Sequence, residues 1–511
     1  MNPYPKLSTY LDTCAEPSQV SDMASARIIV IGAGMGGLAA AARLAHAGHA
    51  VTLLERAGTP GGKMRQVPSD AGPVDAGPTV LTLRHVFDAL FEDLGARLDD
   101  HVTLVPEPLL ARHFWPDGSQ LDLHADLDQS AEAVGAFAGA RAAGQFRAFC
   151  TRTRALYDAF ETPMIETAVP DRAAVTGLVM RNPRLIGAMA PGLSLAARLA
   201  RDFSDPRLRQ LFGRYATYVG GSPYAAPALL SLVWQAEAAG VWRVEGGMHA
   251  LAQAIEDLAR NQGVALHYDA EVAQIDVSGG RIRGVTLRNG ERFDCDAVVF
   301  NGDPRALAHG HLGTGVLDAV APEAVAPRSL SAEVWSFAAT PHGRDLVHHN
   351  VFFGRDPRTE FEAIARGAPP RDPTLYVCAQ DRGTGAAPPA PERFEIIVNA
   401  APDSPEQEFE ECHRRTFQTL KDRGLSFDPS PGPEALTTPA GFESLFPGSG
   451  GALYGRSPEG MMAAFARPTA RSRVPGLYLA GGGAHPGAGV PMATLSGRHA
   501  AETILSDRIS T

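Results

Sequence analysis

Two apolar runs near the start of the chain predict strands that are buried on both faces. Residues 27–31 read RIIVI and residues 50–54 read AVTLL, without the alternation of polar and apolar positions that a half-exposed strand shows. Between them, residues 38–47 are rich in alanine and end at Gly48, which favours a helix. The order of strand, helix and strand predicts the first βαβ unit of an α/β domain.

A second block of regular patterning lies in the middle of the chain. Residues 249–261 place apolar side chains at helical spacing. Residues 265–269, 271–277 and 281–288 are short runs, and Gly-Gly and Asn-Gly turns follow the last two, so we expect all three to form one β-meander. Residues 297–300 read AVVF and predict a further buried strand.

The end of the chain repeats the pattern of its start. Residues 475–492 contain a short apolar strand and a glycine-dense turn, and residues 493–505 have helical spacing. We therefore predict that the chain returns to its first domain, a discontinuous Rossmann-type domain. Its segments are 27–90, 241–304 and 471–508. Segments 91–240 and 305–470 lack this rhythm and are expected to form a mixed α+β substrate domain.

The glycine-rich turn after the first strand predicts a dinucleotide site. GAGMGG at 32–37 matches the pattern G-x-G-x-x-G in the required context of strand, turn and helix. Gly32 permits the tight turn, Gly34 lets a pyrophosphate approach the backbone, and Gly37 lets the helix pack on the strand. Glu55 ends the second strand, where a carboxylate accepts hydrogen bonds from a ribose diol and repels a 2′-phosphate.

Two further segments favour FAD over NAD as the dinucleotide. The turn at 56–65 carries Lys63 and Arg65 just beyond the second strand, where they could meet phosphates or the ribityl side of FAD. DAGPTV at 75–80 offers small residues beside a flat ring, and the returning C-terminal segment could enclose an isoalloxazine. The expected cofactor-binding residues are Gly32, Ala33, Gly34, Gly36, Gly37, Glu55, Arg56, Gly62, Lys63, Arg65, Pro78, Thr79, Val80, Val272, Asn301, Asp303, Gly481, Gly482, Gly483, Gly489 and Val490.

Composition and charge exclude several classes of function. The 511 residues carry 46 Lys and Arg against 57 Asp and Glu, a net charge of −11, so no positive field attracts nucleic acid. The five cysteines are scattered and form no CxxC pair, which predicts reduced thiols in a cytosolic protein. His348 and His349 are adjacent, but no third ligand has suitable spacing, so no metal site is expected.

Neither a membrane span nor a secretory signal is expected. No run of about 18 uncharged apolar residues occurs. Residues 1–26 lack a basic and an apolar region, and we expect a disordered tail there. Met23 lies just before the first strand, so translation from Met1 and from Met23 both stay open.

The combined motifs resemble those of the bacterial carotenoid desaturases, the phytoene desaturase family of FAD enzymes in the amine-oxidase-like, glutathione-reductase-type superfamily. The last matching segment is the most specific, because many other flavoproteins place an acid after the glycine of that strand. The matching segments are the glycine-rich opening with Glu55, GGK at 61–63, DAGPT at 75–79, GVWRVEGGM at 240–248, VVFNGD at 298–303, HHNVFFG at 348–354, DPTLYV at 372–377 and LYLAGGGAHPGAGVP at 477–491.

The resemblance implies a substrate and a reaction. Residues 73–87 and 241–252 look most like desaturases of acyclic 1-hydroxy or 1-methoxy carotenoids. A protein of this kind would introduce a C3–C4 double bond in the carotenoid biosynthesis of a photosynthetic bacterium, with hydride passing to flavin as a neighbouring proton is lost. Two alternatives stay open: phytoene desaturase or another FAD oxidase of this fold, and a non-enzymatic prenyl- or lipid-binding protein.

Candidate site residues follow from the same picture. Candidate polar groups near the flavin are His485, Glu237 and Glu245. His485 lies in a Gly-Pro turn, where a structural histidine explains it equally well. Candidate residues lining a carotenoid tunnel are Tyr215, Tyr218, Trp234 and Trp242. Aromatic residues at such spacing also build ordinary cores.

Residues 171–201 predict a helical part that faces a membrane. They are apolar, yet carry five arginines against one aspartate, a local charge of +4. Such a surface suits anionic lipid, at about 1 kcal/mol for each basic residue, although a solvated hairpin is the alternative. A carotenoid is insoluble in water, so we expect peripheral contact with the inner membrane from the cytoplasm. The electron acceptor would be oxygen or a quinone.

Overall fold

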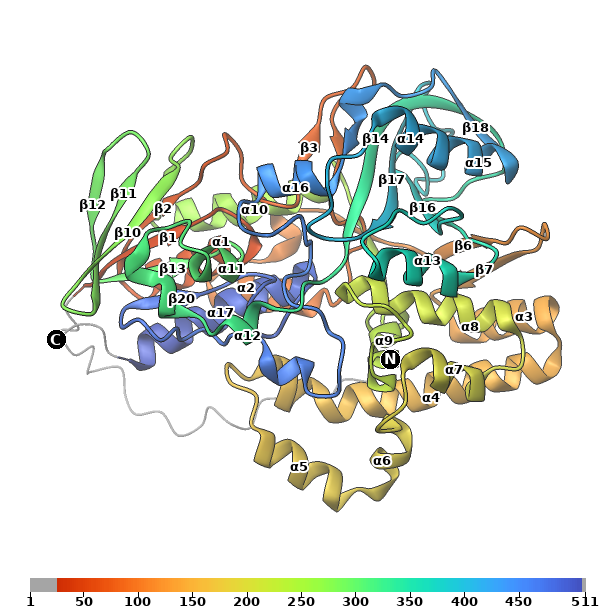
Figure 1. Cartoon of the computed structure of the whole chain (residues 1–511), viewed down its shortest axis with the longest axis horizontal. Coiled ribbons are helices and arrows are strands. Elements are labelled where there is room, and N and C mark those ends of the chain that lie inside the picture. The colour runs from red at the N-terminus through yellow and green to blue at the C-terminus, as the bar shows by residue number, and fades with distance from the viewer. Residues whose placement is uncertain (1–24, 508–511) are drawn as a thin grey trace.

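The computed structural model describes residues 25–507 and contains two main sheets, which lie on opposite sides of the molecule (Figure 1). The expected disordered tail, 1–26, lies outside the described residues except for its last two positions. A parallel sheet with packed helices beside a largely antiparallel one agrees with the predicted α/β fold class.

The first sheet is parallel and takes its strands from three distant parts of the chain. In spatial order they are β20 (Leu477–Leu479), β13 (Ala297–Phe300), β1 (Arg27–Ile31), β2 (Ala50–Leu54) and β9 (Ala265–His267). Ile28 of β1 pairs with Ala297 on one side and Val51 on the other. The apolar runs at 27–31, 50–54 and 297–300 are confirmed as strands, because both faces of this sheet are covered.

Three helices pack together beside this sheet. They are α1 (Met35–His46), α10 (Met248–Asn261) and α17 (Val490–Ser506), and α1 packs against both others. Two of them, α1 and α17, meet without side chains between them at their glycines. A Cβ atom on Gly497 of α17 would lie 2.3 Å from the Gly36 carbonyl oxygen of α1. A Cβ atom on Gly36 would lie 2.6 Å from the Gly481 nitrogen. A segment near the start of the chain and a segment near its end therefore touch through their backbones.

The expected three-stranded meander is wrong in its first strand. Residues 265–267 form β9, which pairs in parallel with β2 of the first sheet. The meander consists instead of β10 (Val272–Ser278), β11 (Arg281–Leu287) and β12 (Arg292–Asp294). The reason is that β9 follows helix α10, and a helical crossover delivers the next strand parallel to its sheet.

The second sheet is mostly antiparallel and belongs to the other side of the molecule (Figure 1). In spatial order its strands are β18 (Leu425–Asp428), β14 (Ser331–Gly343), β17 (Glu392–Ala400), β16 (Leu375–Ala379), β15 (His349–Phe352), β6 (Leu109–Phe114) and β7 (Gln120–His124), and β19 (Leu436–Thr437) pairs with β14. One face packs an apolar cluster that includes Phe337, Phe352 and Phe394. Val351 and Tyr376 belong to another cluster, which helices complete.

These helices form the lower part of the molecule in Figure 1. They are α3 (Leu127–Ala138), α4 (Ala140–Glu161), α7 (Leu195–Asp202), α8 (Pro206–Gly213) and α9 (Val233–Ala238). Helices α5 (Arg172–Arg181) and α6 (Pro183–Met189) project below them. Among the described helices, none combines the length and apolar character needed to cross a membrane.

Because α1 and α17 are in backbone contact, we expect that adding one methyl group between them destabilises the protein. We expect Gly497→Ala to lower the free energy of unfolding by about 1–3 kcal/mol, because its Cβ meets the backbone of α1. Gly144→Ala in α4 is the matched control, because no atom lies within 4 Å of its added Cβ. That control should gain up to about 1 kcal/mol in helix propensity. Urea unfolding that ranks Gly497→Ala as stable as the control would contradict the contact.

Candidate functional site

The glycine-rich turn is shaped by one asparagine from a neighbouring strand. Asn301 follows β13, and its Nδ2 donates a hydrogen bond to the Gly32 carbonyl oxygen at 3.2 Å. A Cβ atom on Gly34 would lie 2.8 Å from the same Nδ2. Gly32 itself adopts φ 101°, which other residues rarely reach. Asn301, predicted as a cofactor residue, therefore fixes the turn.

Glu55 lies where a ribose-binding acid is expected. Its side chain is buried, and its carboxylate accepts hydrogen bonds from the Ala33 nitrogen at 2.6 Å and the Ala57 nitrogen at 2.8 Å. The carboxylate is thereby held against the glycine-rich turn. This placement supports the proposal that Glu55 binds the ribose of the dinucleotide.

The other predicted glycines converge on the same place. Gly61 forms a bridge with Gly34, and a Cβ atom on Gly62 would lie 3.2 Å from the Gly34 Cα. Gly483, from the C-terminal turn, lies 2.9 Å from the Cβ position of Gly455. Gly489 precedes α17 and Val490 begins it, so this helix starts beside the turn. Bare backbone from several segments makes a cradle that a dinucleotide can approach closely.

A cluster of buried cations lies beside this cradle. Lys63 and Arg467 both interact electrostatically with Asp303 and Arg328. Burial lowers the pKa of Lys63 to about 8 and that of Arg467 to about 10. Lys63 Nζ donates to the Leu453 carbonyl oxygen at 2.6 Å. Three cations thus face a single carboxylate, which is the charge excess that a buried diphosphate would neutralise.

Several predicted cofactor residues have other partners in the structure. Asp303 binds Arg328 and accepts a hydrogen bond from the Arg305 nitrogen at 3.0 Å. Arg56 is exposed and donates to the Ser444 carbonyl oxygen at 3.2 Å. Arg65 donates to Thr437 Oγ1 at 2.7 Å. Val272 is buried at the start of β10. Direct cofactor contact by these residues stays a prediction.

The segment 75–80 links the two sides of the molecule. Asp75 accepts hydrogen bonds from the Met248 nitrogen, at 2.5 Å, and the His249 nitrogen, and so binds the N-terminus of α10. Pro78, Thr79 and Val80 are half-buried. Thr79 Oγ1 and the Tyr376 hydroxyl, from the second sheet, form a hydrogen bond of 2.7 Å.

A cavity of about 380 Å³ opens beside this segment. Asp75, Thr79 and Met248 line it from the first domain, and His348, Cys378 and Gln380 line it from the second sheet. Glu245 also borders it but is exposed to solvent. Glu245, one of the three predicted catalytic groups, therefore borders this cavity from its solvent-exposed side.

The aromatic candidates fall into two places. Tyr215 and Trp234 pack with their ring centroids 5.5 Å apart, and Tyr218 lies 5.0 Å from Tyr215. Trp242 packs instead against the core of the first domain. Glu237, predicted as a candidate catalytic acid, accepts hydrogen bonds from the Tyr215 and Tyr218 hydroxyls and is buried. Burial raises the pKa of Glu237.

His485 has the contacts of a structural histidine. Its Nε2 and the Thr167 carbonyl oxygen form a hydrogen bond of 2.9 Å, and its ring stacks on His499. Burial lowers its pKa, so the ring is neutral at physiological pH. These contacts favour the structural alternative given above over a proton relay.

The sequence spacing indicated no third metal ligand near His348 and His349, and this indication is wrong. Strand pairing brings Cys378 opposite His349, and possible ligand atoms of all three residues lie within 4.8 Å of one another. Cys378 is 29 positions away along the chain, which is why local spacing missed it. All three side chains are buried, and burial lowers the pKa of His348 to about 4.

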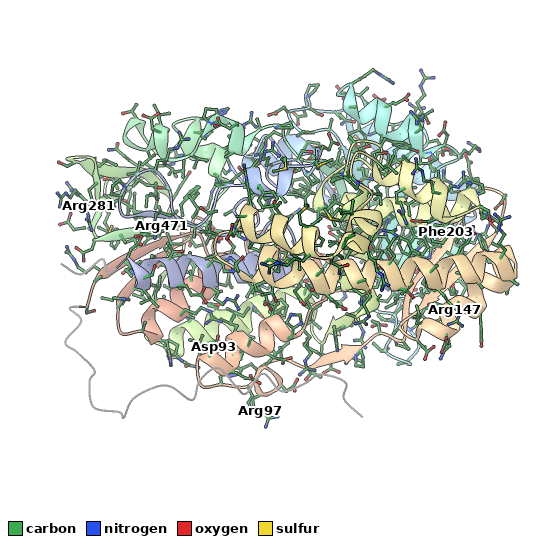
Figure 2. All side chains as sticks on the ribbon, turned by 90° about the horizontal axis from the view of Figure 1, so that it is seen from below. Asp93, Arg97, Arg147, Phe203, Arg281 and Arg471 are labelled. Atoms are coloured by element: carbon green, nitrogen blue, oxygen red, sulfur yellow. The ribbon has the colours of Figure 1, made fainter. Side chains whose placement is uncertain are left out.

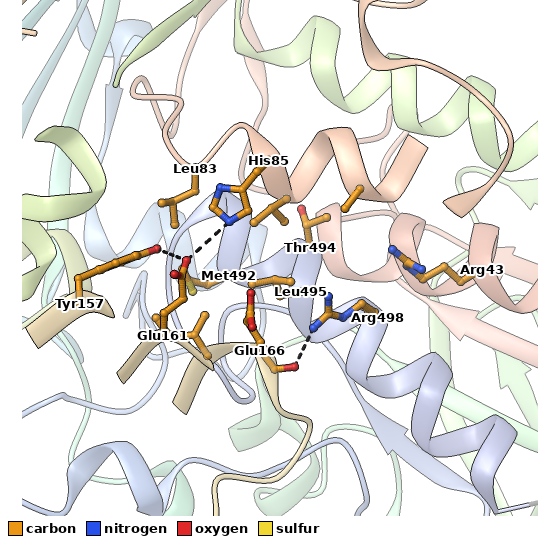
Figure 3. A pocket seen from close by; sticks show the side chains of 13 residues that line it. Arg43, Leu83, His85, Tyr157, Glu161, Glu166, Met492, Thr494, Leu495 and Arg498 are labelled. Atoms are coloured by element: carbon orange, nitrogen blue, oxygen red, sulfur yellow. Dashed lines mark hydrogen bonds and ion pairs between the residues drawn. The ribbon is translucent and has the colours of Figure 1, made fainter. Parts of the chain in front are cut away.

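A second, smaller cavity of about 100 Å³ lies between α2 (His85–Asp93), α4 and α17 (Figure 3). Leu83, Met492 and Leu495 form part of its apolar wall. Its rim is polar, since Glu161 accepts a hydrogen bond from the Tyr157 hydroxyl at 2.8 Å. Arg498 closes another side by donating to the Glu166 carbonyl oxygen.

Four residues of this site escaped sequence analysis: Arg214, Arg328, Tyr376 and Arg467. Tyr376 lies in the motif at 372–377, but its contacts with Thr79 and Arg214 come from distant segments, and the three arginines belong to no motif. The one available signal was indirect: Arg supplies 43 of the 46 basic residues, because only three are lysines, so buried cationic sites had to be sought among arginines.

Known proteins that resemble this chain define the class of protein to which it belongs. Residues 35–334 match the family described as flavin containing amine oxidoreductase. The solved structures that resemble this one include an oxidoreductase from Methanosarcina mazei (TM-score 0.60, 18% identity, 93% of this chain and 100% of that one) and cyclohexylamine oxidase from Brevibacterium oxydans (TM-score 0.56, 18% identity, 94% and 99%). The chain belongs to the flavin-containing amine oxidoreductase family, and its cofactor is FAD.

More similar sequences narrow the family to the predicted branch. The chain is 58% identical to hydroxyneurosporene desaturase of Cereibacter sphaeroides over 486 residues, which cover 95% of this chain and 98% of that protein. It is 53% identical to the hydroxyneurosporene desaturase of Rhodobacter capsulatus, with 94% and 98% covered. It is 31% identical to 4,4'-diapolycopene oxygenase of Methylomonas, with 94% and 98% covered. The resemblance to the carotenoid desaturases is confirmed.

Lys63 gives FAD binding a predicted pH dependence. A diphosphate favours the ammonium form, which is complete below the pKa of about 8 and is lost above it, so FAD affinity should fall as pH rises from 7 to 9. We expect Lys63→Met to weaken FAD binding about 10- to 100-fold at pH 7 and to flatten this decline. Lys421→Met, at an exposed lysine, is the control. Titration showing the same decline in Lys63→Met would refute the role of Lys63.

Proposed function

We propose that the protein is an FAD-dependent carotenoid desaturase, which introduces a C3–C4 double bond into acyclic 1-hydroxy or 1-methoxy carotenoids. The observation that carries this proposal is the 58% and 53% identity, over nearly the full chain, to two hydroxyneurosporene desaturases. The cofactor cradle supports this proposal, because such a reaction needs a bound flavin.

FAD, when bound, accepts the hydride that leaves the substrate. The residues described here bind the cofactor, hold the substrate and exclude water. Glu55 would bind the ribose, the cluster around Lys63 would bind the phosphates, and Thr79 would border the reacting region. The aromatic cluster with Tyr215, Tyr218 and Trp234 would line the path of the polyene. Among the candidate acids and bases, Glu237 is held between two tyrosines, which suits a positioning role.

We also propose that α5 and α6 rest on a membrane. Met180 and Ile186, on these helices, are 70% and 40% exposed, and Met461 on the neighbouring loop is 59% exposed. Arg172 contacts this loop through Phe465, with 5.3 Å between guanidinium and ring centroid. In the view from below, the yellow helices of this part lie in front of the long α4, which carries Arg147 (Figure 2).

The arginines of this region differ in their availability. Arg181 and Arg184 are exposed, whereas Arg198 pairs with Asp202 at 3.0 Å. Exposed apolar side chains beside free arginines suit an anionic lipid surface. Such contact, with the inner membrane from its cytoplasmic side, would give access to the insoluble substrate. The electron acceptor would be oxygen or a quinone.

The predicted activity is tested by product analysis. The FAD-loaded protein should convert a 1-hydroxy carotenoid to its 3,4-didehydro product, detected by the absorbance shift of one added conjugated bond and by mass loss of two hydrogens. Phytoene and simple amines should be poor substrates. Exclusive turnover of amines or phytoene would favour the other oxidase functions, and failure to take up FAD would favour a lipid-binding protein.

Membrane contact is tested by sedimentation with vesicles of anionic phospholipid. We expect Met180→Glu combined with Met461→Glu to weaken vesicle binding at least about 10-fold, because two apolar side chains no longer enter the lipid. Leu317→Glu is the matched control, because Leu317 is also exposed but its helical turn, Thr314–Ala319, contacts β10 of the meander. Equal binding by the wild type and the double variant would sink the proposal, as would an equal loss in the control.

A further inference from the structure

Arg214 presents unused hydrogen-bond donors inside the molecule. It lies directly after α8, and its Nη1 donates to the Tyr218 hydroxyl at 2.9 Å. Among the described residues this is the single hydrogen bond of its guanidinium, although a guanidinium carries five N–H groups. None of its nitrogens is among the fully buried atoms that lack a partner. The remaining N–H groups therefore face accessible space.

Aromatic rings hold this guanidinium in place. It lies 5.0 Å from the ring centroid of Tyr218 and 5.4 Å from that of Tyr376. Glu237 accepts a hydrogen bond of 3.0 Å from the Tyr218 hydroxyl, so Tyr218 links the carboxylate to Arg214. This arrangement balances the buried charge without covering the outer N–H groups of Arg214.

The guanidinium also lies near the proposed reacting region. The Tyr376 hydroxyl, below one face of Arg214, binds Thr79 of the segment 75–80. Arg214 interacts electrostatically with Tyr454 as well. Tyr454 neighbours Gly455, whose Cβ position is 2.9 Å from the Cα of Gly483 in the C-terminal turn. Through Tyr376 and Tyr454, Arg214 is thus connected to both segments that we propose to flank the flavin.

We propose that Arg214 donates a hydrogen bond to the oxygen on C1 of the carotenoid and thereby selects substrates with an oxygenated end. The inference rests on the proposed function, because that reaction places an oxygen close to the bond being oxidised. The oxygen on C1 is three bonds from C3, which puts it about 3–4 Å away. The group that binds this oxygen must therefore lie close to the flavin, and the links of Arg214 to Thr79 and Tyr454 are the basis for proposing it there.

The donor chemistry of arginine makes this selection specific. A guanidinium only donates hydrogen bonds, so a hydroxyl and a methoxy oxygen both serve as acceptors. A hydrocarbon end offers no acceptor and leaves a charged group without its partner in an apolar site. Glu237 acts as a positioning residue, since it orients the guanidinium through the Tyr218 hydroxyl without touching the substrate.

The experiment compares three substrates on the FAD-loaded enzyme: 1-hydroxyneurosporene, its 1-methoxy ether and neurosporene. We expect kcat/KM for both oxygenated carotenoids to exceed that for neurosporene by about 10- to 100-fold in the wild type. Arg214→Met should lower kcat/KM for the oxygenated pair by the same factor and leave neurosporene nearly unchanged. Arg214→Lys, which keeps the charge with fewer donors, should give an intermediate ratio.

Arg152→Met is the matched control. Arg152 is also a half-buried arginine of the helical part, but both of its terminal nitrogens are engaged, with Asp202 at 2.8 Å, Ser231 at 2.9 Å and the Ala188 carbonyl oxygen. Its removal should lower stability and leave the substrate ratio unchanged. FAD absorbance of each purified variant checks that the cofactor is loaded.

Two kinds of failure can be told apart. If the wild type converts none of the three carotenoids, the proposed function is wrong. If it converts them but Arg214→Met lowers all rates equally, or the ratio is unchanged, the role of Arg214 alone is refuted. If Arg214→Met fails to fold, the wild-type enzyme alone still tests the proposal. A group that only donates hydrogen bonds should bind the hydroxyl and the ether alike, so turnover of 1-hydroxyneurosporene without turnover of its methoxy ether would contradict the role of Arg214.

Discussion

The structure depends on backbone meeting backbone where three distant segments adjoin. Gly36 touches both Gly481 and Gly497, and Asn301 fills the remaining space against Gly32 and Gly34. Any side chain here would separate α1 from α17 and open the parallel sheet at the same time. Because parallel strands present their carboxyl ends at one edge, this contact also decides where a dinucleotide lies. The same backbone contact therefore determines both the architecture and the position of the cofactor site.

Charge is the second consequence of this convergence. Lys63, Arg328 and Arg467 come from three segments and share the single carboxylate of Asp303. Burying such an excess is costly unless an anion accompanies it, and the lowered pKa of Lys63 expresses that cost. The protein thus stores an unfavourable interaction in its folded state, which FAD phosphates would relieve on binding. Cofactor loading and stability should rise together.

The features that the sequence predicts are local, whereas the features that it misses depend on contacts between distant segments. Strands β1 and β2 were predicted at their observed limits, because fully buried strands are unbroken apolar runs. Glu55 and the glycine-rich turn followed from spacing alone. Strand β9 was assigned to the wrong sheet, because pairing partners are set by tertiary packing. Arg214 belongs to no motif, and besides the nearby Tyr218 its neighbours come from β16 and α9.

The second sheet shows why an apolar substrate site also needs polar groups. Strand register sets four polar side chains in one buried row across its inner face: Ser336, Glu395, Cys378 and His349. The neighbouring row holds apolar residues with Tyr376 among them. A uniformly apolar cavity would accept a polyene in any register along its length, because hydrophobic contact is not directional. Under the proposed function, polar groups at one end would fix which carbons face the flavin, and the apolar cluster would supply the affinity.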